Sequence, residues 1–403
     1  MEYIQLGNLV ELKQGMAINA KSNHLVSKEE TNLALLRIAD MPTKSKVIFM
    51  SENTPERFIA SEDDIIYTRT GQVGLVFRKQ QGVVHNNCFR VIPNSEEKLD
   101  KGYLYWYLSL NSIKKFANSI ASGSAQPDLP HSTFKKIRIW LPHIETQKKL
   151  AKMLDQYELL IENNNKRIKL LEQMAENLYK EWFVRFRFPG YETVEFEGKS
   201  PKCWNQLRLD QFGIQLESGA RPKGGINSSI DDGVPSLGAE SVKGLAEFDY
   251  SDVKLIPEEF YRKLKRGKNR GNHILIYKDG AYIGKVTLFK YGFPFERFAI
   301  NEHVFFMNSI RAEYQNYLYF TLKQTSYFTL MQNLNRNAAQ PGLSQLDINR
   351  IKIIEPDQVT VISFNDIIEP ILKKVFQLAK KNHLLIKQRD MLLPRLMSGK
   401  LEV

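Results

Sequence analysis

The sequence predicts an α+β fold: two similar mixed α/β domains in tandem, separated by two long helices that pack as an antiparallel coiled coil. Two observations predict it. One is a coiled-coil pattern of apolar residues that occurs twice, and the other is a match of the chain onto itself at a constant offset. Together they imply a pseudo-two-fold internal repeat.

The first long helix is predicted between Gln147 and Trp182, where apolar residues alternate at spacings of four and three with one polar position, Asn164. That spacing is typical of a coiled-coil seam. The stretch from Phe364 to Leu396 repeats it, with polar Asn382 and Arg389 in two positions. We expect the two helices to pair, and we expect Pro370 to kink or restart the second one. The seam positions are Leu150, Leu154, Tyr157, Ile161, Ile168, Leu171, Ala175, Leu178 and Trp182, then Phe364, Ile368, Ile371, Val375, Leu378, Leu385, Leu392 and Leu396.

The repeat keeps one register over a long stretch. Tyr103-Leu-Tyr-Trp returns as Tyr317-Leu-Tyr-Phe and Ala-Gln126-Pro returns as Ala-Gln340-Pro, both 214 positions later. The offset persists through the following strands into the helices, which a chance match would not do. Upstream the copies are looser: Tyr67 is matched to Tyr277 with the next glycine out of step, and Leu12-Lys-Gln-Gly15 resembles Leu216-Glu-Ser-Gly219.

Each copy therefore has two parts: an N-terminal β-rich part that differs between the copies, which we call its front, and a C-terminal long helix that is preserved. Short β-rich runs separated by Gly, Asn and Pro predict a mixed or antiparallel sheet in each front. An aromatic helix follows in each copy (Tyr103 to Phe116, Tyr314 to Met331), and then a polar loop and a short strand ending in proline. We expect domains at 1–142 and 206–356, long helices at 143–187 and 357–403, and a turn-rich linker at 188–205.

Composition narrows the function. The formal net charge of +12 predicts a polyanionic partner, and nucleic acid fits better than a membrane because the charge is spread along the chain. No signal-like start and no long apolar run is present, so we expect a cytoplasmic protein without a membrane partner. Two cysteines exclude a disulfide framework. We find no motif for base methylation and no metal-ligand spacing, so we expect neither a catalytic residue nor a metal site.

The residues just described carry a family resemblance. The duplicated Gln-Pro-x-Leu loop, the Ile-x-Ile-x-x-Pro strand exit, Gln147 shortly after Pro142, and the helix end at Leu178-Tyr-Lys-Glu-Trp182 resemble the specificity subunit of type I restriction-modification systems. The resemblance covers essentially the whole chain. One departure is Val361, where the first copy has Gln147.

The resemblance implies a non-catalytic chain that binds double-stranded DNA. Each domain would be a target recognition domain for one half of a bipartite site. The helices would set the gap and dock two modification (methyltransferase) subunits, and restriction (translocase/nuclease) subunits would join them. No cofactor is expected on this chain, and S-adenosylmethionine, ATP and Mg are expected on the partner subunits. Two alternatives remain open: a stand-alone pseudo-dimeric DNA-binding regulator, and a single-chain DNA methyltransferase or nuclease.

Candidate DNA contacts are polar residues in the loops of each front. Arg and Lys suit phosphates and guanine edges, whereas Asn and Gln suit adenine. For any one of them a turn-capping role competes with base contact. Gln126 and Gln340, present in both copies, fit loop shaping or phosphate contact better than base choice. The candidates are Arg37, Thr68, Arg69, Thr70, Gln72, Asn86, Asn87, Ser124 and Gln126 in the first domain, and Arg221, Lys223, Lys243, Lys278, Lys285, Asn301, Arg336, Asn337 and Gln340 in the second.

Overall fold

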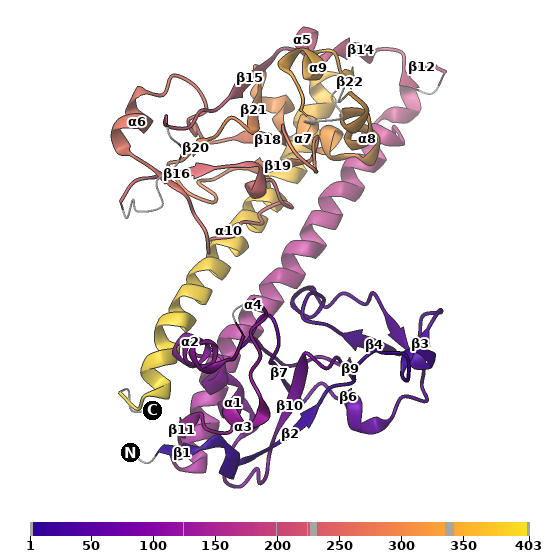
Figure 1. The fold of residues 1–403 in the computed structure, drawn as a ribbon. Helices are drawn as coiled ribbons and strands as arrows, with labels where there is room; N and C mark the ends of the chain where they lie inside the picture. The colour runs from indigo at the N-terminus through magenta and orange to yellow at the C-terminus, as the bar shows by residue number, and fades with distance from the viewer. Residues whose placement is uncertain are drawn as a thin grey trace. The chain divides into compact units, whose positions relative to one another are not determined.

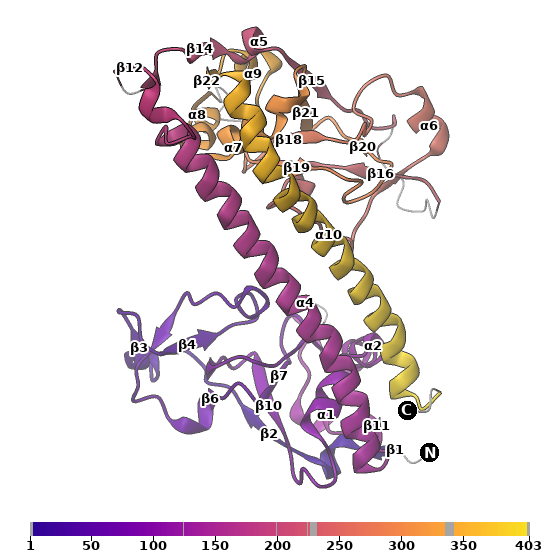
Figure 2. The same cartoon turned by 180° about the vertical axis from the view of Figure 1, so that it is seen from behind.

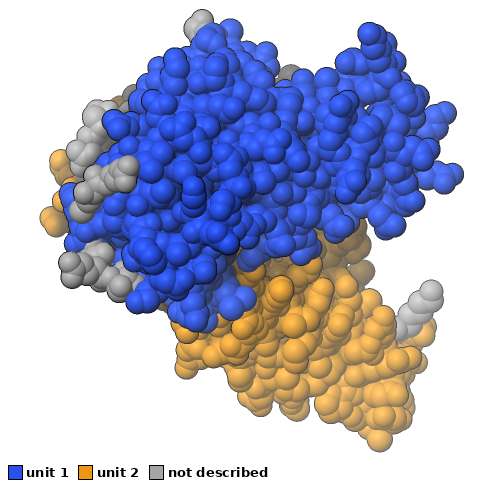
Figure 3. Space-filling view, turned by 90° about the horizontal axis from the view of Figure 1, so that it is seen from below, with its two compact units in different colours: residues 1–161, 385–403 blue, residues 162–384 orange. Residues whose placement is uncertain are grey.

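The computed structural model describes residues 3–123, 125–198, 200–223, 225, 232–334 and 342–400. The chain divides into two compact units (Figure 3): residues 1–161 with 385–403 form unit 1, and residues 162–384 form unit 2. The divisions fall inside the long helices α4 (Ile144–Tyr179) and α10 (Gln358–Met397). Each long helix therefore contributes residues to both units.

Unit 1 is organised around a four-stranded antiparallel sheet with the order β2-β10-β7-β8. A second sheet, β3-β5-β4-β9-β6, contains one parallel pair, β4 with β9, and β1 pairs with β11. The elements are β1 (Tyr3–Gln5), β2 (Val10–Gln14), β3 (Val26–Ser27), β4 (Leu33–Leu36), β5 (Phe49–Met50), β6 (Ile59–Ala60), β7 (Ile65–Thr68), β8 (Val76–Phe77), β9 (Gly82–Val84), β10 (Cys88–Pro93), α1 (Lys101–Leu108), α2 (Asn111–Ile120), α3 (His131–Phe134) and β11 (Arg138–Trp140) (Figure 1).

Unit 2 repeats this topology. Its four-stranded antiparallel sheet has the order β15-β21-β18-β19, a smaller sheet contains the parallel pair β16 with β20, and β14 pairs with β22. The internal repeat is thus confirmed by strand order. The elements are β12 (Phe196–Glu197), β13 (Ser200–Pro201), β14 (Asn205–Arg208), α5 (Leu209–Phe212), β15 (Ile214–Ser218), β16 (Val234–Leu237), β17 (Leu255–Ile256), α6 (Glu258–Lys263), β18 (His273–Tyr277), β19 (Val286–Phe289), β20 (Ala299–Ile300), β21 (Val304–Ser309), α7 (Gln315–Lys323), α8 (Thr325–Leu334), α9 (Gln345–Asn349) and β22 (Lys352–Glu355).

Sheet register corrects one part of the sequence match. The backbone N–H of Thr68 donates to the carbonyl of Leu75, and in unit 2 the N–H of Tyr277 donates to the carbonyl of Lys285. Tyr277 therefore corresponds to Thr68, not to Tyr67. The sequence match followed side-chain identity, whereas the backbone ladder fixes the alignment. With this register Gly71 corresponds to Gly280. Unit 2 has one extra residue in the turn that follows these glycines.

The recurring glycine after the first strand of each main sheet has a steric cause. A Cβ added at Gly15 would lie 2.2 Å from the carbonyl oxygen of His85, and one at Gly219 would lie 1.7 Å from that of Ile300. In both units the chain passes against the neighbouring backbone too closely for any side chain. Glycine therefore recurs at this position in both copies because only glycine allows the two backbone segments to come so close.

The seam of the long helices is confirmed by packing and burial. In unit 2, Trp182 packs on Phe364 with ring centroids 5.8 Å apart, and Asn164 is hydrogen-bonded to Asn382. Asn164 precedes Trp182 in the chain whereas its partner Asn382 follows Phe364, so within unit 2 the two chain segments run antiparallel, side by side (Figure 2). In unit 1, the seam leucines Leu150 and Leu396 share one core with the main sheet. Across the described residues, no helix is long and apolar enough to span a membrane.

The structure contradicts two expectations about helix continuity, a restart of the second long helix at Pro370 and an unbroken aromatic helix in each copy. Pro370 does not restart the second helix, because α10 is continuous around it. The proline is exposed, so water can satisfy the carbonyl that it leaves unpaired. The aromatic helices, in contrast, are each broken into two. Leu110 and Gln324 adopt extended backbone between α1 and α2 and between α7 and α8.

The turn-rich segment 188–205 lies within unit 2. Phe188 and Trp204 near its ends are buried and stack with ring centroids 5.0 Å apart. The Trp204 Nε1–H donates to Asp357 at 3.0 Å, just before α10 begins. These contacts tie both ends of the segment into the core of unit 2.

Candidate nucleic-acid interface

Three loops meet at one end of the main sheet of unit 1. The turn after β7, the lead-in to β10 and the Gln-Pro loop are joined through their backbones: Arg69 N–H donates to Asn87 O, and Gly71 N–H donates to Pro127 O, each at 2.8 Å. We call these residues, 69–72, 85–87 and 126–128 together with Gln14, the rim of unit 1. The Gln-Pro loop is thus part of the surface that carries most of the predicted contacts.

A single carboxylate orders the centre of this rim. Asp128 accepts two hydrogen bonds from Arg69, at 3.0 Å from Nε and 2.6 Å from Nη2, and one from the Thr70 hydroxyl at 2.6 Å. The third guanidinium nitrogen, Nη1, donates to Gln14 Oε1 at 3.1 Å. Hydrogen bonding from Arg69 lowers the pKa of Asp128, so the ion pair is present at neutral pH. Bidentate pairing fixes the plane of the guanidinium, which still has two N–H groups for a ligand.

The other candidates of unit 1 divide into exposed and structural groups. Gln72 and Gln126 are exposed, and Asn86 and Asn87 are half-buried. Thr68 is buried, and its hydroxyl donates to the carbonyl of Gln72, so it shapes the turn and does not face a ligand. Ser124 lies outside the described residues.

Arg37 lies close enough to the rim to act on it electrostatically. It is paired with Asp40, with Nε 2.5 Å from Oδ2. Burial, and then the charge of Arg37, lower the pKa of His85, which belongs to the rim. The positive charge of Arg37 therefore contributes to the potential at the rim.

Unit 2 forms the same junction with different side chains. Lys278 N–H donates to His303 O, and Leu343 N–H donates to Lys278 O, each at 3.0 Å. His303 Nδ1 is 3.2 Å from Asp279 Oδ2, and Arg221 Nε is 2.5 Å from Glu302 Oε1. We call residues 278–280, 301–303 and 342 together with Arg221 the rim of unit 2.

The two rims place the central carboxylate on opposite loops. By backbone pairing Arg69 corresponds to Lys278, Thr70 to Asp279, and Asp128 to Gly342. A Cβ at Gly342 would lie 2.7 Å from the Asp279 carboxylate, so a side chain there would require that carboxylate to move. Unit 1 supplies the acid from the Gln-Pro loop and unit 2 supplies it from the strand end.

The remaining candidates of unit 2 lie in or near this rim or in a second groove. Lys243 and Lys285 line a groove of about 310 Å³ together with Lys323. Asn301 Oδ1 accepts a hydrogen bond from the His303 backbone at 2.9 Å, so its side chain shapes the rim. Arg221, Lys223 and Lys285 are exposed, whereas Arg336, Asn337 and Gln340 lie outside the described residues.

Sequence reasoning missed the residues that organise the rims: Gln14, Asp128, Asp279 and His303. Two of them could have been noticed because they lie next to repeated motifs: Gln14 precedes the recurring Gly15, and Asp128 follows the recurring Gln-Pro pair. Their partners, however, lie 55 and 59 residues away along the chain. Sequence spacing could not identify those pairs.

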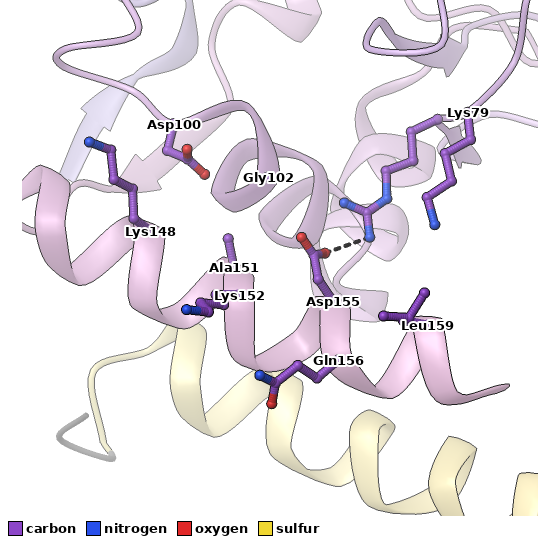
Figure 4. A pocket seen from close by; sticks show the side chains of 10 residues that line it. Lys79, Asp100, Gly102, Lys148, Ala151, Lys152, Asp155, Gln156 and Leu159 are labelled. Carbon is purple, nitrogen blue, oxygen red and sulfur yellow. Dashed lines mark hydrogen bonds and ion pairs between the residues drawn. The ribbon is translucent and has the colours of Figure 1, made fainter. Parts of the chain in front are cut away.

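A second feature of unit 1 joins the sheet to the long helix. Arg78 donates to Asp155 at 2.6 Å (Figure 4). The indole N–H of Trp106 donates to the same carboxylate at 2.8 Å. Around this pair is a groove of about 600 Å³, also lined by Lys79, Lys148 and Lys152. In unit 2 the ion pair Lys290–Glu369, at 2.5 Å, lies at the matching place, since Glu369 is 214 positions after Asp155. In both units the same helix position holds an acid that pairs with the basic residue directly after a strand, β8 in unit 1 and β19 in unit 2.

Comparison with known proteins supports the same family as the sequence motifs. The profile of the type I restriction modification DNA specificity domain matches residues 1–173. The MjaIX type I restriction enzyme specificity subunit of Methanocaldococcus jannaschii is 28% identical over 353 residues, which are 84% of this chain and 78% of that protein. The HindI specificity subunit of Haemophilus influenzae is 22% identical over 98% of this chain and 94% of that protein.

The fold agrees. The crystal structure of a type I restriction-modification S subunit from M. genitalium superimposes with a TM-score of 0.60 at 15% identity, covering 98% of this chain and 96% of that one. The family profile includes the Gln-Pro loop and most of α4, where unit 1 carries its rim and its half of the seam. In sequence the chain is similar to type I restriction-modification DNA specificity subunits, and in fold it is similar to a solved S subunit of that kind.

Proposed function

We propose that each unit reads one half of a bipartite target in double-stranded DNA and that this chain supplies recognition and no catalysis. The observation that carries the proposal is the pair of rims. They occupy the same end of the same four-stranded sheet and share one backbone junction, but they present different side chains. Two units with the same sheet but different side chains at the rim suit two half-sites of different sequence.

The charged groups of the rims suit duplex DNA. Arg69 keeps free N–H groups while Asp128 holds its plane, which is the geometry that reads a guanine edge or a phosphate oxygen. Beside the rim of unit 2, Lys243 and Lys285 lie in one groove and suit phosphate contacts. A net charge of +12 would add a salt-dependent attraction to the whole duplex.

The long helices suit two further roles: spacing the half-sites and docking two methyltransferase subunits. A helix of about 40 residues spans roughly 60 Å, and half-sites one turn apart are about 34 to 36 Å centre to centre. Apolar side chains on α4 face water in both units, with Leu159 63% exposed in unit 1 and Leu170 60% exposed in unit 2. Exposed apolar groups on a charged helix suit a protein partner. Methyl transfer from S-adenosylmethionine, and ATP- and Mg-dependent translocation and cleavage by restriction subunits, would belong to the partner chains.

The test is the methylated motif of a host. Hosts that express the partner methyltransferase with and without this chain are compared by sequencing modified bases. We expect a bipartite methylated motif that disappears with this chain. An unchanged methylation pattern would overturn the proposal. Promoter-specific binding by the chain alone would then support a regulator, and methyl transfer by the chain alone would support a single-chain enzyme.

A further inference from the structure

The turn between β18 and β19 of unit 2 holds an exposed aromatic ring in a fixed place. Tyr282 is 62% exposed, whereas the next residue, Ile283, is 2% exposed and packs into the core. The Gln332 side-chain amide donates to Ile283 O at 2.7 Å, and Gly284 N–H donates to Tyr277 O at 2.9 Å. The turn is therefore anchored directly behind the tyrosine.

Unit 1 has the same anchor beneath a different residue. Val73 is 2% exposed, and the Asn118 side-chain amide donates to its carbonyl at 3.0 Å. Asn118 and Gln332 are 214 positions apart, so the same helix position holds both turns. The exposed residue before the anchor is Gln72 in unit 1 and Tyr282 in unit 2. The two copies therefore share the hydrogen bond that anchors the turn, but they differ in the side chain that the turn exposes to solvent.

Both turns project from the rims. Gln72 is two residues after Thr70, which contacts Asp128, and Tyr282 is three residues after Asp279, which contacts His303. The Lys285 ammonium lies 6.0 Å from the centroid of the Tyr282 ring, so a cation accompanies the aromatic group. An amide that can pair with adenine has thus been replaced by a ring that can pack on a thymine methyl group or on a base face.

We propose that this turn position, Gln72 in unit 1 and Tyr282 in unit 2, is a specificity-determining contact to a base of duplex DNA. The inference rests on the proposed function and adds the residue at which the two half-sites are told apart. Tyr282 acts through its ring, because the ring is the part that the turn holds out into solvent. Its edge contact with Tyr277, at 6.2 Å between centroids, orients it from behind.

The experiment uses the chain assembled with its methyltransferase subunits and a DNA library in which both half-sites are randomised. Methylated molecules are sequenced, and rates are measured on the best target. A wild-type complex that gives no bipartite motif would overturn the proposed function itself. A wild-type complex that gives one tests the role of the turn separately.

For Tyr282→Ala we expect base preference to be lost at one position of one half-site, with the rate on the best target falling about tenfold and the other half-site unchanged. Gln72→Ala should do the same to the other half-site. Tyr282→Phe should keep the motif because it keeps the ring. The matched control is Ile310→Ala: Ile310 is 65% exposed but follows the opposite end of β21 from the rim, so it should change nothing.

The inference would be overturned by a Tyr282→Ala complex with an unchanged motif and a rate within about twofold of wild type. It would also be overturned if both half-sites weakened together, because that is the result of a phosphate contact or of a structural role. Either result would leave the proposed function standing, since the wild-type motif is measured first.

Discussion

Asn164 donates a side-chain hydrogen bond to Asn382 Oδ1 at 2.8 Å, and both residues are only 6% exposed among the apolar seam residues of unit 2. The Asn382 amide in turn donates to Asn165 Oδ1 at 2.7 Å. A buried amide pair is satisfied in one alignment of the two helices and left without partners when one helix slips. The pair therefore selects the register within unit 2.

Replacing one member of this pair should cost more than replacing both. Asn164→Leu leaves Asn382 Oδ1 buried without its donor, and we expect the free energy of unfolding to fall by about 1–3 kcal/mol. Asn164→Leu with Asn382→Leu should recover most of that loss because the seam becomes apolar. Urea denaturation followed by circular dichroism measures both. Equal losses in the single and double variants would contradict the register role.

The anchor between Arg78 and Asp155 should stabilise unit 1. Asp155→Ala removes the acceptor for the Trp106 indole and one of the two acceptors of Arg78, which keeps Glu158, and we expect a loss of about 1–3 kcal/mol in the free energy of unfolding. Asp155→Asn keeps an acceptor for Trp106 and should lose less. Lys148→Ala, in the same groove but exposed, is the control (Figure 4). If Asp155→Ala is no more destabilised than the control, the anchor contributes nothing measurable.

The matching acid in unit 2 should make stability depend on pH. Burial alone would raise the pKa of Glu369, but hydrogen bonds from Lys290, Tyr291 and Asn316 lower it overall. A carboxyl with a depressed folded-state pKa stabilises the fold above its ordinary pKa, and this contribution is lost as pH falls through the folded value. Wild type should therefore lose more stability between neutral pH and about pH 4 than Glu369→Gln does. Parallel pH profiles for the two proteins in denaturant titrations would rule out this contribution.

Asp128 should matter for one half-site only. Asp128→Ala releases the Arg69 guanidinium from its fixed plane, and we expect the partner-loaded complex to lose about tenfold in methylation rate on its best target. The loss should appear as weaker base preference in the half-site that Gln72→Ala also affects. Asp279→Ala is the matched variant in the other unit and should affect the other half-site. If the two variants affect the same half-site, the proposed correspondence of the rims is wrong.

Lengthening both helices by one heptad should change the gap between half-sites. Seven residues added after Ile161 and seven before Leu385 keep the phase of the seam and add about 10 Å of helix, or roughly three base pairs. Methylome sequencing of a host with the lengthened chain measures the new gap. An unchanged gap with intact half-sites would show that the helices do not set the spacing.

Local periodicity explains what the sequence predicted well. The seam of α4 and α10 could be located because apolar residues at spacings of four and three specify one helical face, and the constant offset of 214 tied the two helices together. Burial of Leu154 and Phe364 confirms the pattern.

Long-range pairing explains what could not be predicted. The contact of Arg69 with Asp128 depends on loops that meet only in the folded sheet, and its counterpart in unit 2 has moved the acid from one loop to another. Matching identical residues therefore misaligned Tyr277 by one position. The breaks after α1 and α7 could not be read from apolar periodicity. Near them, Ser109 and Thr321 hydrogen-bond to the carbonyls four residues back, at Tyr105 and Tyr317.

The core of unit 1 includes Leu393, Leu396 and Met397, which the ribosome adds only after all of unit 2 has been synthesised. Unit 2 spans residues 162–384, so at about 5–20 residues per second unit 1 waits roughly 10 to 45 seconds for its last core residues. During that interval the core that contains Leu150 and Leu154 lacks the three apolar side chains that α10 contributes. A nascent chain of this kind would depend on chaperones or fast elongation more than its stability after completion suggests.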